Sequence, residues 1–428
     1  MIIQPTLLEI VATLCFTTAL LHTLFVKRFQ HWALQLPEGS AGENLLHLLG
    51  EVEVVFGLWA GVFLVFLSIY QSPEQAITFL EQQNFNEPIF VFVILVICST
   101  RPILTIVEFL IDRASNILPF QRSISFFLSC LILGPLFGSI ITEPAAMTVT
   151  ALILSERLFK STLSEELKYA TLGLLFVNVS IGGTLTPYAA TPILMVAKKW
   201  NWDLQWMLSH FGWRAALACI LSTVAISLRF KDELSTLEFK LTSSKSIEAA
   251  HSIPAWLYFL HCIFLAGVVA SSHHSSVVIG LFLFFLGMIS ITAKYQDELK
   301  LREGFLVAFF LGGLVLLGTP QKWWLEPLLA QLNSLTLFMG SVALTAVTDN
   351  AALTYLGSQV PALTEASRYA LVAGAVTGGG LTVIANAPNP AGYGILNSAF
   401  GKEGISALEL FKAALIPTLI AAACFLVG

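Results

Sequence analysis

Twelve apolar segments follow one another along the chain, separated by short polar stretches. Most are long enough to cross the hydrocarbon core of a membrane, which takes roughly 20 residues as a helix. Six segments precede the most charged loop, residues 229–253, and six follow it. They are 2–26, 45–70, 88–112, 123–156, 168–198, 211–228, 254–271, 274–292, 304–319, 328–360, 368–398 and 407–427. The pattern predicts an all-α polytopic membrane protein built from two halves.

Two segments in each half are too long for one span and are interrupted by turn-forming or polar residues. The interruptions are TEP at 142–144, GGTLTP at 182–187, TDN at 348–350 and GGGLT at 378–382. Proline and adjacent glycines end or bend a helix. We therefore expect 123–156 and 328–360 to be re-entrant hairpins, and 168–198 and 368–398 to be broken helices.

The interrupted segments of the two halves resemble each other. TEPAAMT at 142–148 matches TDNAALT at 348–354, and GGTLT at 182–186 matches GGGLT at 378–382, in the same order. Transporters are often built from repeats of this kind. The sequence predicts a first transmembrane repeat over 1–228, a cytoplasmic linker over 229–253 and a second, inverted repeat over 254–428.

The basic residues define the orientation. If the two hairpins enter and leave on one side, each half has about five spans, and the second half is inverted relative to the first. One side then receives fifteen Lys and Arg residues and the other receives five (Lys198, Lys199, Arg214, Lys322 and Arg368). The richer side is cytoplasmic by the positive-inside rule. We expect a bacterial cytoplasmic (inner) membrane protein with both termini outside, whose first segment is a retained span rather than a cleaved signal peptide.

The composition excludes several classes of protein. Of the 428 residues, 56% are hydrophobic and 11% are charged, against about 25% charged residues in soluble domains. A soluble enzyme or a nucleic-acid binder is excluded on this ground. The six cysteines lie singly in apolar stretches, so neither a disulfide framework nor a zinc site is predicted. No phosphate-binding loop, H-E-x-x-H or G-x-S-x-G motif occurs, so we expect no enzyme and no cofactor beyond transported ions.

Broken helices inside a membrane indicate a binding site. Unpaired backbone groups are tolerated there only where they line a cavity or pack in protein, and the freed carbonyl ends attract a cation. Hydroxyl, amide and backbone oxygens beside the breaks suit a hard cation such as Na⁺. Each break also fits a simple packing kink. The candidate ion- and proton-binding residues are Thr142, Glu143, Asn178, Gly183, Thr184, Thr186, Thr348, Asp349, Asn350, Gly379, Thr382 and Asn386.

Glu143 and Asp349 occupy equivalent positions at the two predicted hairpin tips. A carboxylate at that depth is costly and by default functional, and a proton and a sodium ion would compete for it. The alternative for both residues is a structural role as a helix cap, which for Glu143 is at the helix beginning at Pro144. We expect Na⁺ at Asp349, Asn350, Thr142 and Glu143, with Asp349 the stronger candidate.

Other charges within the apolar segments have either a structural or a functional role. They are Glu51, Glu53, Arg101 and Glu108. The sequence is compatible both with structural ion pairs between these residues and with a direct role in transport.

Several motifs resemble those of a known superfamily. NVSIGGTLTPYAATP at 178–192 and GGGLTVIANAPNPAG at 378–392 resemble the ion transporter superfamily, which includes arsenite-efflux, divalent-anion symport and NhaD-like antiport proteins. Within it, VTDNAALTYLG at 347–357 and SIITEPAAMTVTALIL at 139–154 are similar to the bacterial family called "putative Na⁺/H⁺ antiporter". The resemblance implies paired inverted repeats whose hairpins and broken helices form the ion site. Dicarboxylate-type members have a Ser-Asn-Thr motif at both tips, whereas this chain has acidic tips, which disfavour an anionic substrate.

The sequence therefore predicts a secondary active transporter that exchanges Na⁺ for H⁺ by alternating access. The alternative is a sodium-coupled symporter or effluxer of a small anion. An intramembrane enzyme or a pure channel agrees less well with two repeated sets of broken helices. The expected partners are small inorganic ions and the lipid bilayer, with no nucleic acid. A homodimer formed through the first spans of each half is compatible with the pattern.

Overall fold

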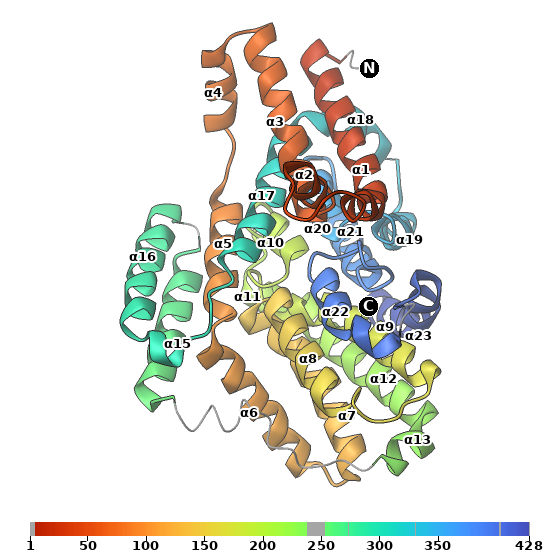
Figure 1. The fold of residues 1–428 in the computed structure, drawn as a ribbon. Coiled ribbons are helices and arrows are strands. Elements are labelled where there is room, and N and C mark those ends of the chain that lie inside the picture. The colour runs from red at the N-terminus through yellow and green to blue at the C-terminus, as the bar shows by residue number, and fades with distance from the viewer. Residues whose placement is uncertain (1–4, 238–252, 273, 330, 402–403, 428) are drawn as a thin grey trace.

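The computed structural model describes residues 5–237, 253–272, 274–329, 331–401 and 404–427 (Figure 1). This part of the chain is helical and contains no β-strand. Up to the middle of the chain the helices are α1 (Leu7–Ala33), α2 (Ala41–Leu49), α3 (Val52–Tyr70), α4 (Pro73–Glu81), α5 (Asn86–Cys98), α6 (Arg101–Ile117), α7 (Arg122–Ile141), α8 (Glu143–Arg157), α9 (Glu165–Gly182), α10 (Thr191–Ala197), α11 (Leu204–Met207) and α12 (Trp213–Arg229). The remainder are α13 (Lys231–Thr236), α15 (Ala255–Ala270), α16 (Ser275–Ile291), α17 (Leu301–Gly318), α18 (Lys322–Leu329), α19 (Ser334–Thr345), α20 (Asn350–Ser358), α21 (Glu365–Gly378), α22 (Asn389–Leu396) and α23 (Ala407–Leu426).

Several helices are long and apolar enough to cross a membrane. Within the described residues there are five such stretches, or six if one bent pair counts as a span. The five are Glu53–Tyr70, Arg122–Ile141, Leu204–Arg229, Leu301–Leu329 and Ala407–Leu426. Shorter apolar helices lie at Leu7–Thr23, Ala255–Ala270, Ser275–Ile291 and Ser334–Thr345. The chain is thus an all-helical, multi-pass membrane protein, and the figure of about five spans per half stays a prediction.

The predicted segment 88–112 is not one straight helix. It is divided into α5 and α6, which meet at 67°. Pro102 is the second residue of α6, and proline has no N–H to continue the hydrogen bonding of the preceding helix. The Thr100 hydroxyl instead donates to the Ile97 carbonyl at 2.7 Å and helps to close the end of α5. The sequence analysis missed this break.

The four predicted interruptions are all present. Only Thr142 separates α7 from α8, and its φ of 75° reverses the chain direction. Gly138 of α7 faces Ala146 of α8, and Gly134 faces Thr150, so the two helices run antiparallel side by side. They form a helical hairpin with its tip at Thr142.

The other three interruptions are longer. α9 passes through a short 3-10 turn, Gly183–Leu185, and a loop before α10 begins. α21 ends at Gly378, and residues 379–388 separate it from α22. Residues 346–349 separate α19 from α20. The predicted broken helices are therefore confirmed as interrupted helices, with their breaks where the glycines lie.

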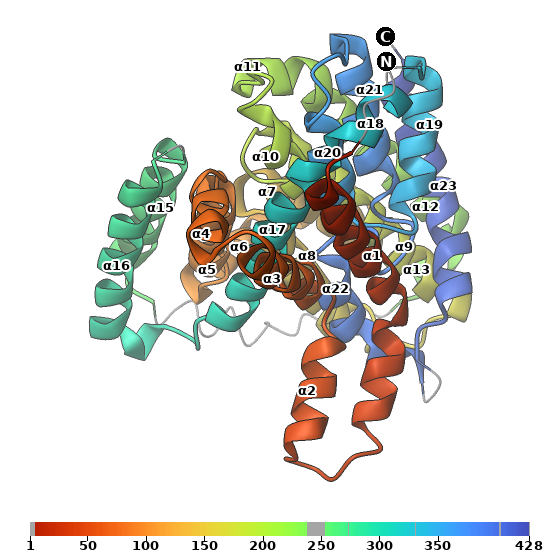
Figure 2. The ribbon, with the colours of Figure 1, turned by 90° about the horizontal axis from the view of Figure 1, so that it is seen from above.

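The interrupted helices of the two halves pack against each other reciprocally. α22 lies beside α8, as both views show (Figures 1 and 2), and α20 packs against α10. α9 also contacts α21, where the Ser180 hydroxyl donates to the Val376 carbonyl at 2.7 Å. Each half thus contributes to the surroundings of the other half's breaks.

Two regions lie outside this centre. α15 and α16 pack on α5 and α6 at one edge of the molecule (Figures 1 and 2). The predicted linker 229–253 contains α13, while residues 238–252 lie outside the described residues. The boundaries of the two repeats stay predictions.

Candidate functional site

Glu143 lies at the tip of the first hairpin, as the first residue of α8. Its side chain is fully buried. Oε2 accepts a hydrogen bond of 3.4 Å from Nδ2 of Asn386, which belongs to the α21–α22 break. Oε1 is buried without a hydrogen-bond partner among the described residues. The first half's carboxylate is therefore held by the second half's broken helix.

Asp349 lies at the corresponding point of the second half and is 9% exposed. It is the N-cap of α20, and its Oδ1 accepts from the backbone N–H groups of Ala351 and Ala352 at 2.8 and 3.1 Å. The helix-capping role considered for Glu143 thus belongs to Asp349, while no side-chain cap is formed at the start of α8.

Asn386 lies near both carboxylates. Besides its bond to Glu143, it lines a small cavity together with Asp349 and Glu53. The cavity volume is about 20 Å³, enough for one water-sized occupant. Glu143, Asn386 and Asp349 therefore form a continuous polar group at the junction of the two halves.

Several buried polar atoms near the breaks have no hydrogen-bond partner in the described part of the chain. They are Thr142 Oγ1, Glu143 Oε1, Asn350 Oδ1 and Nδ2, Asn386 Oδ1 and Asn389 Oδ1. An unsatisfied buried polar atom costs about 1–3 kcal/mol, so such atoms are rare unless a ligand or water serves them. Most of this set are oxygens, the ligands that hard cations prefer.

The backbone at two glycines approaches these side chains closely. A Cβ at Gly183 would lie 2.6 Å from Cγ of Glu143, and one at Gly379 would lie 2.8 Å from Nδ2 of Asn350. Real Cβ atoms do not come so near, so a residue other than glycine would displace the polar side chain. Gly183 and Gly379, predicted as site residues, therefore lie directly against the polar group.

The remaining predicted site residues are engaged elsewhere. Asn178 is buried between α7, α9 and α12: its Nδ2 donates to the Leu131 carbonyl at 2.8 Å and to Thr223 Oγ1 at 2.9 Å, and its Oδ1 accepts from Ser222 at 2.9 Å. Four predicted threonines have hydroxyls that donate to backbone carbonyls, namely Thr184, Thr186, Thr348 and Thr382. Their hydroxyls thus stabilise the breaks. Each hydroxyl oxygen still has a lone pair that can accept a hydrogen bond or bind a cation.

Sequence reasoning missed three residues near the breaks. Glu53 was considered only as a charge within an apolar segment, and it lines the cavity with Asp349. The Ser139 hydroxyl donates to the Gly182 carbonyl and accepts from the Leu185 backbone N–H, so it joins the first hairpin to the first broken helix. Ser180 lies against Gly379. Nothing in the spacing of Glu53 links it to the second half, whereas both serines lie within four residues of a predicted break.

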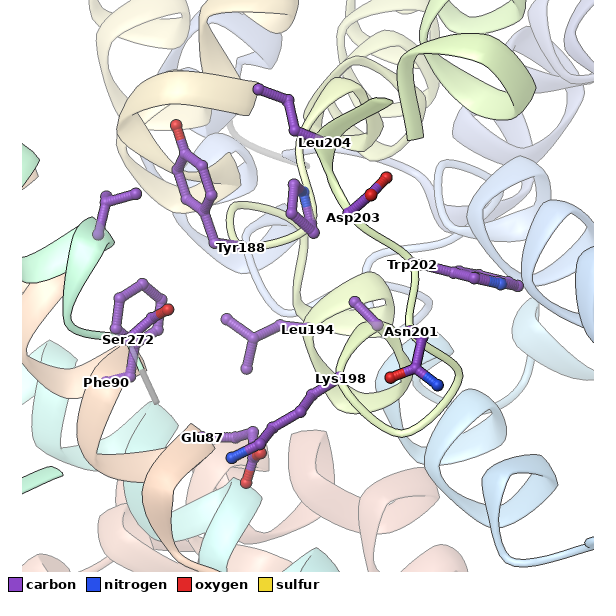
Figure 3. Close-up of a pocket in the computed structure, with 13 residues that line it drawn as sticks. Glu87, Phe90, Tyr188, Leu194, Lys198, Asn201, Trp202, Asp203, Leu204 and Ser272 are labelled. Carbon is purple, nitrogen blue, oxygen red and sulfur yellow. The ribbon is translucent and has the colours of Figure 1, made fainter. Parts of the chain in front are cut away.

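A larger cleft of about 530 Å³ lies between α5, α15 and the loop between α9 and α10 (Figure 3). Pro187 and Tyr188 of that loop line one side, and residues 201–204 line another. Lys198 points toward Glu87 across the cleft (Figure 3) and interacts with it electrostatically. The cleft therefore reaches from the surface of the molecule to the break of the first half.

Neither Glu143 nor Asp349 forms an ion pair with any basic side chain that the structure describes. Elsewhere in the apolar part, Glu51 pairs with Arg302, and Asp112 pairs with Arg157. Over the same residues there is no cluster of three or more His, Cys, Asp or Glu side chains that could hold a metal ion. The two carboxylates are thus accompanied by amide and hydroxyl groups rather than by opposite charges.

The fold and this polar group define a multi-pass helical membrane protein of the transporter type, with interrupted helices meeting at buried carboxylates. The comparison with family models agrees with this class. Residues 7–427 match the model described as "Putative Na+/H+ antiporter", and the chain belongs to that family. No curated protein matches the chain in sequence.

Proposed function

We propose that the protein is a secondary active transporter that exchanges Na⁺ for H⁺ across the bacterial cytoplasmic membrane by alternating access. Asp349 and Glu143 are the exchanging carboxylates. Thr142 and Asn350 complete the proposed Na⁺ ligands, and Asn386 connects the two acidic groups. We also propose that its two halves are inverted repeats and that it belongs to the ion transporter superfamily.

One observation carries the proposal: Asn386 bonds the buried Glu143 and lines a cavity with the buried Asp349, and neither carboxylate forms an ion pair with a basic side chain among the described residues. An ionised carboxylate without a counter-charge is very costly inside a protein in a membrane. Glu143, whose Oε1 has no hydrogen-bond partner in the described residues, must therefore hold either a proton or a cation, and Asp349, which backbone N–H groups of α20 stabilise, can hold either. Because both occupants use the same oxygens, binding of one expels the other, which is the chemical requirement of an antiporter.

The same group argues against the alternative substrate. An anion placed near Glu143 and Asp349 would meet negative charge, and no Lys or Arg forms an ion pair with either carboxylate within the described residues. The symport or efflux of a small anion is therefore not the function that we propose.

Contacts at the two ends of the molecule support the proposed topology. Trp206 donates to Glu365, and Arg368 lies over the ring of Trp200. Two segments that the sequence predicts outside the membrane on the same side are therefore in contact. At the other end, Arg302 binds Glu51. The cleft at Lys198 and the cavity at Glu53 would then give access to the breaks from opposite sides of the membrane.

The first test is transport by the purified protein in proteoliposomes with an imposed pH gradient and a pH-sensitive dye. Na⁺ is expected to dissipate the gradient with the wild type but not with Asp349→Asn. Losing a charged ligand costs about 1.5–3 kcal/mol, so Na⁺ affinity should fall about ten- to a hundredfold. The exposed Asp232→Asn in α13 is the matched control and should transport normally.

Glu143→Gln tests the second carboxylate in the same assay. Glu156→Gln is its control, because Glu156 lies on the same helix and is exposed. If Glu143→Gln and Asp349→Asn both kept the wild-type response to Na⁺, the assignment of the exchanging carboxylates would be wrong. If neither Na⁺, Li⁺ nor K⁺ dissipated the gradient with the wild type, the antiport function itself would be refuted.

A further inference from the structure

Glu53 brings a third carboxylate to the same group of residues, from a helix that contains no predicted break. It is the second residue of α3, and it lines the cavity that Asp349 and Asn386 also line. The other lining residues are apolar and come from α17, from the α21–α22 break and from the start of α22. Glu53 is the only one of the lining residues contributed by the first half.

A second observation indicates that this cavity can bind a ligand. Asn386 is 1% exposed, and its Oδ1 has no hydrogen-bond partner in the described residues, although its Nδ2 binds Glu143. The cavity of about 20 Å³ therefore has two carboxylates and an amide among its lining residues. A water-sized cation fits both the volume and the charge.

The charges around Glu53 distinguish it from its neighbour on the same turn. Glu51 forms an ion pair with Arg302 of α17. Arg302 also attracts Glu53, while Glu51 repels it. Arg302 bonds Glu51 and forms no ion pair with Glu53 among the described residues, so the carboxylate of Glu53 can still bind a cation.

Exposure increases from Asp349 toward Glu53. Asp349 is 9% exposed, whereas Glu53 is partly exposed, and Arg302 beyond it is exposed. Asp349, Glu53 and Arg302 therefore follow one another from the buried carboxylates to the surface of the molecule.

We propose that Glu53 is a third cation-binding residue, which holds Na⁺ in the cavity shared with Asp349 and Asn386 as the ion passes between Asp349 and the Arg302 end of the molecule. The inference rests on the proposed antiport function, for which it supplies a path on one side of the membrane.

The test combines Na⁺ binding with transport for Glu53→Gln, Glu53→Asp and a control. Binding of radioactive Na⁺ is measured on the full-length protein in detergent, and Na⁺-driven dissipation of a pH gradient is measured in proteoliposomes. Glu53→Gln should raise the half-saturating Na⁺ concentration about tenfold in both assays, because a charged ligand is lost. Glu53→Asp keeps the charge but shortens the reach, so its effect should be smaller.

Glu303→Gln is the control, since Glu303 is exposed in the first turn of α17 near Arg302. It should bind Na⁺ as the wild type does. Wild-type Na⁺ binding by Glu53→Gln would overturn the inference. If that variant failed to fold, a loss of Na⁺ binding in the control Glu303→Gln as large as the loss in Glu53→Asp would overturn it instead.

The two assays separate this inference from the proposed function. If the wild type bound Na⁺ without transporting it, antiport would be refuted, while weaker binding by Glu53→Gln would still support the cation site. If Asp349→Asn abolished transport and Glu53→Gln bound and transported normally, antiport would stand and the role of Glu53 would be refuted. An absence of any Na⁺ binding by the wild type would overturn both.

Discussion

At the scale of single residues, buried asparagines with similar sequence surroundings have different roles. Asn178 precedes the first glycine break, and its side-chain donors and acceptor are all bonded to α7 and α12. Asn386 follows the second glycine break and leaves Oδ1 without a partner in the described residues. The completeness of the hydrogen bonding, rather than the residue type, separates the structural residue from the proposed ligand.

We predict that Asn178→Ala destabilises the protein without changing its response to Na⁺. The substitution leaves the Leu131 carbonyl and the hydroxyls of Ser222 and Thr223 without this partner, at about 1–3 kcal/mol for a buried unsatisfied group. Thermal unfolding in detergent should show a lower midpoint, and the half-saturating Na⁺ concentration in proteoliposomes should equal that of the wild type. A large increase in that concentration would instead place Asn178 among the ion ligands.

At the scale of elements, the breaks bring backbone and side chains from different helices close together. α8 begins at Glu143, and the turn after α9 passes so near that Gly183 has no room for a side chain. The break is therefore a packing feature as well as a pair of buried helix ends. Its shape depends on residues 40 positions apart in the sequence.

The second prediction concerns Gly183→Ala, which should impair Na⁺ transport by displacing Glu143. The new Cβ would meet Cγ of Glu143 at 2.6 Å, and overpacking of this kind costs about 1–3 kcal/mol. Gly394→Ala in α22 is the control, because a Cβ there meets nothing within 4 Å. In a helix, alanine should stabilise that position slightly. Equal transport rates for the two variants would contradict the proposed contact between Gly183 and Glu143.

The sequence was most informative where a local signal determines a local structure. The glycine pairs and the Thr-Glu-Pro and Thr-Asp-Asn motifs placed all four interruptions, because a helix cannot pass through them unchanged. The break before Pro102 was missed, since one proline in an apolar stretch is also compatible with a continuous span. The cavity contact between Glu53 and Asp349 could not be predicted, because it depends on how α3 packs and not on spacing. The same holds for the bond between Asn386 and Glu143.

At the scale of the whole molecule, the reciprocal packing of α8 with α22 and of α20 with α10 makes the candidate site a shared property of both halves. The carboxylates come from the tip of the α7–α8 hairpin and from the break between α19 and α20, and the amide that bonds Glu143 comes from the α21–α22 break. In the proposed mechanism the two acidic groups therefore respond together to the ions that reach them.

This coupling gives the proposed transport a definite dependence on pH. A protonated carboxylate is a poor ligand, so lowering the pH should raise the half-saturating Na⁺ concentration and raising the pH should lower it. The change should be about tenfold per pH unit where one proton competes with one Na⁺, and steeper if both carboxylates must lose protons. Dissipation of the pH gradient at several Na⁺ concentrations, on both sides of neutrality, measures it. A constant half-saturating concentration would mean that Na⁺ and H⁺ bind separately.

The bond between Asn386 and Glu143 also has a consequence for biosynthesis. The two residues are 243 positions apart, so more than half of the chain must be made after Glu143 before its partner exists. Until then the nascent first half carries an acidic tip that no amide from the second half can meet. The first hairpin cannot reach its final packing before the second half has been made. Assembly of the candidate ion site must therefore be among the last events in folding.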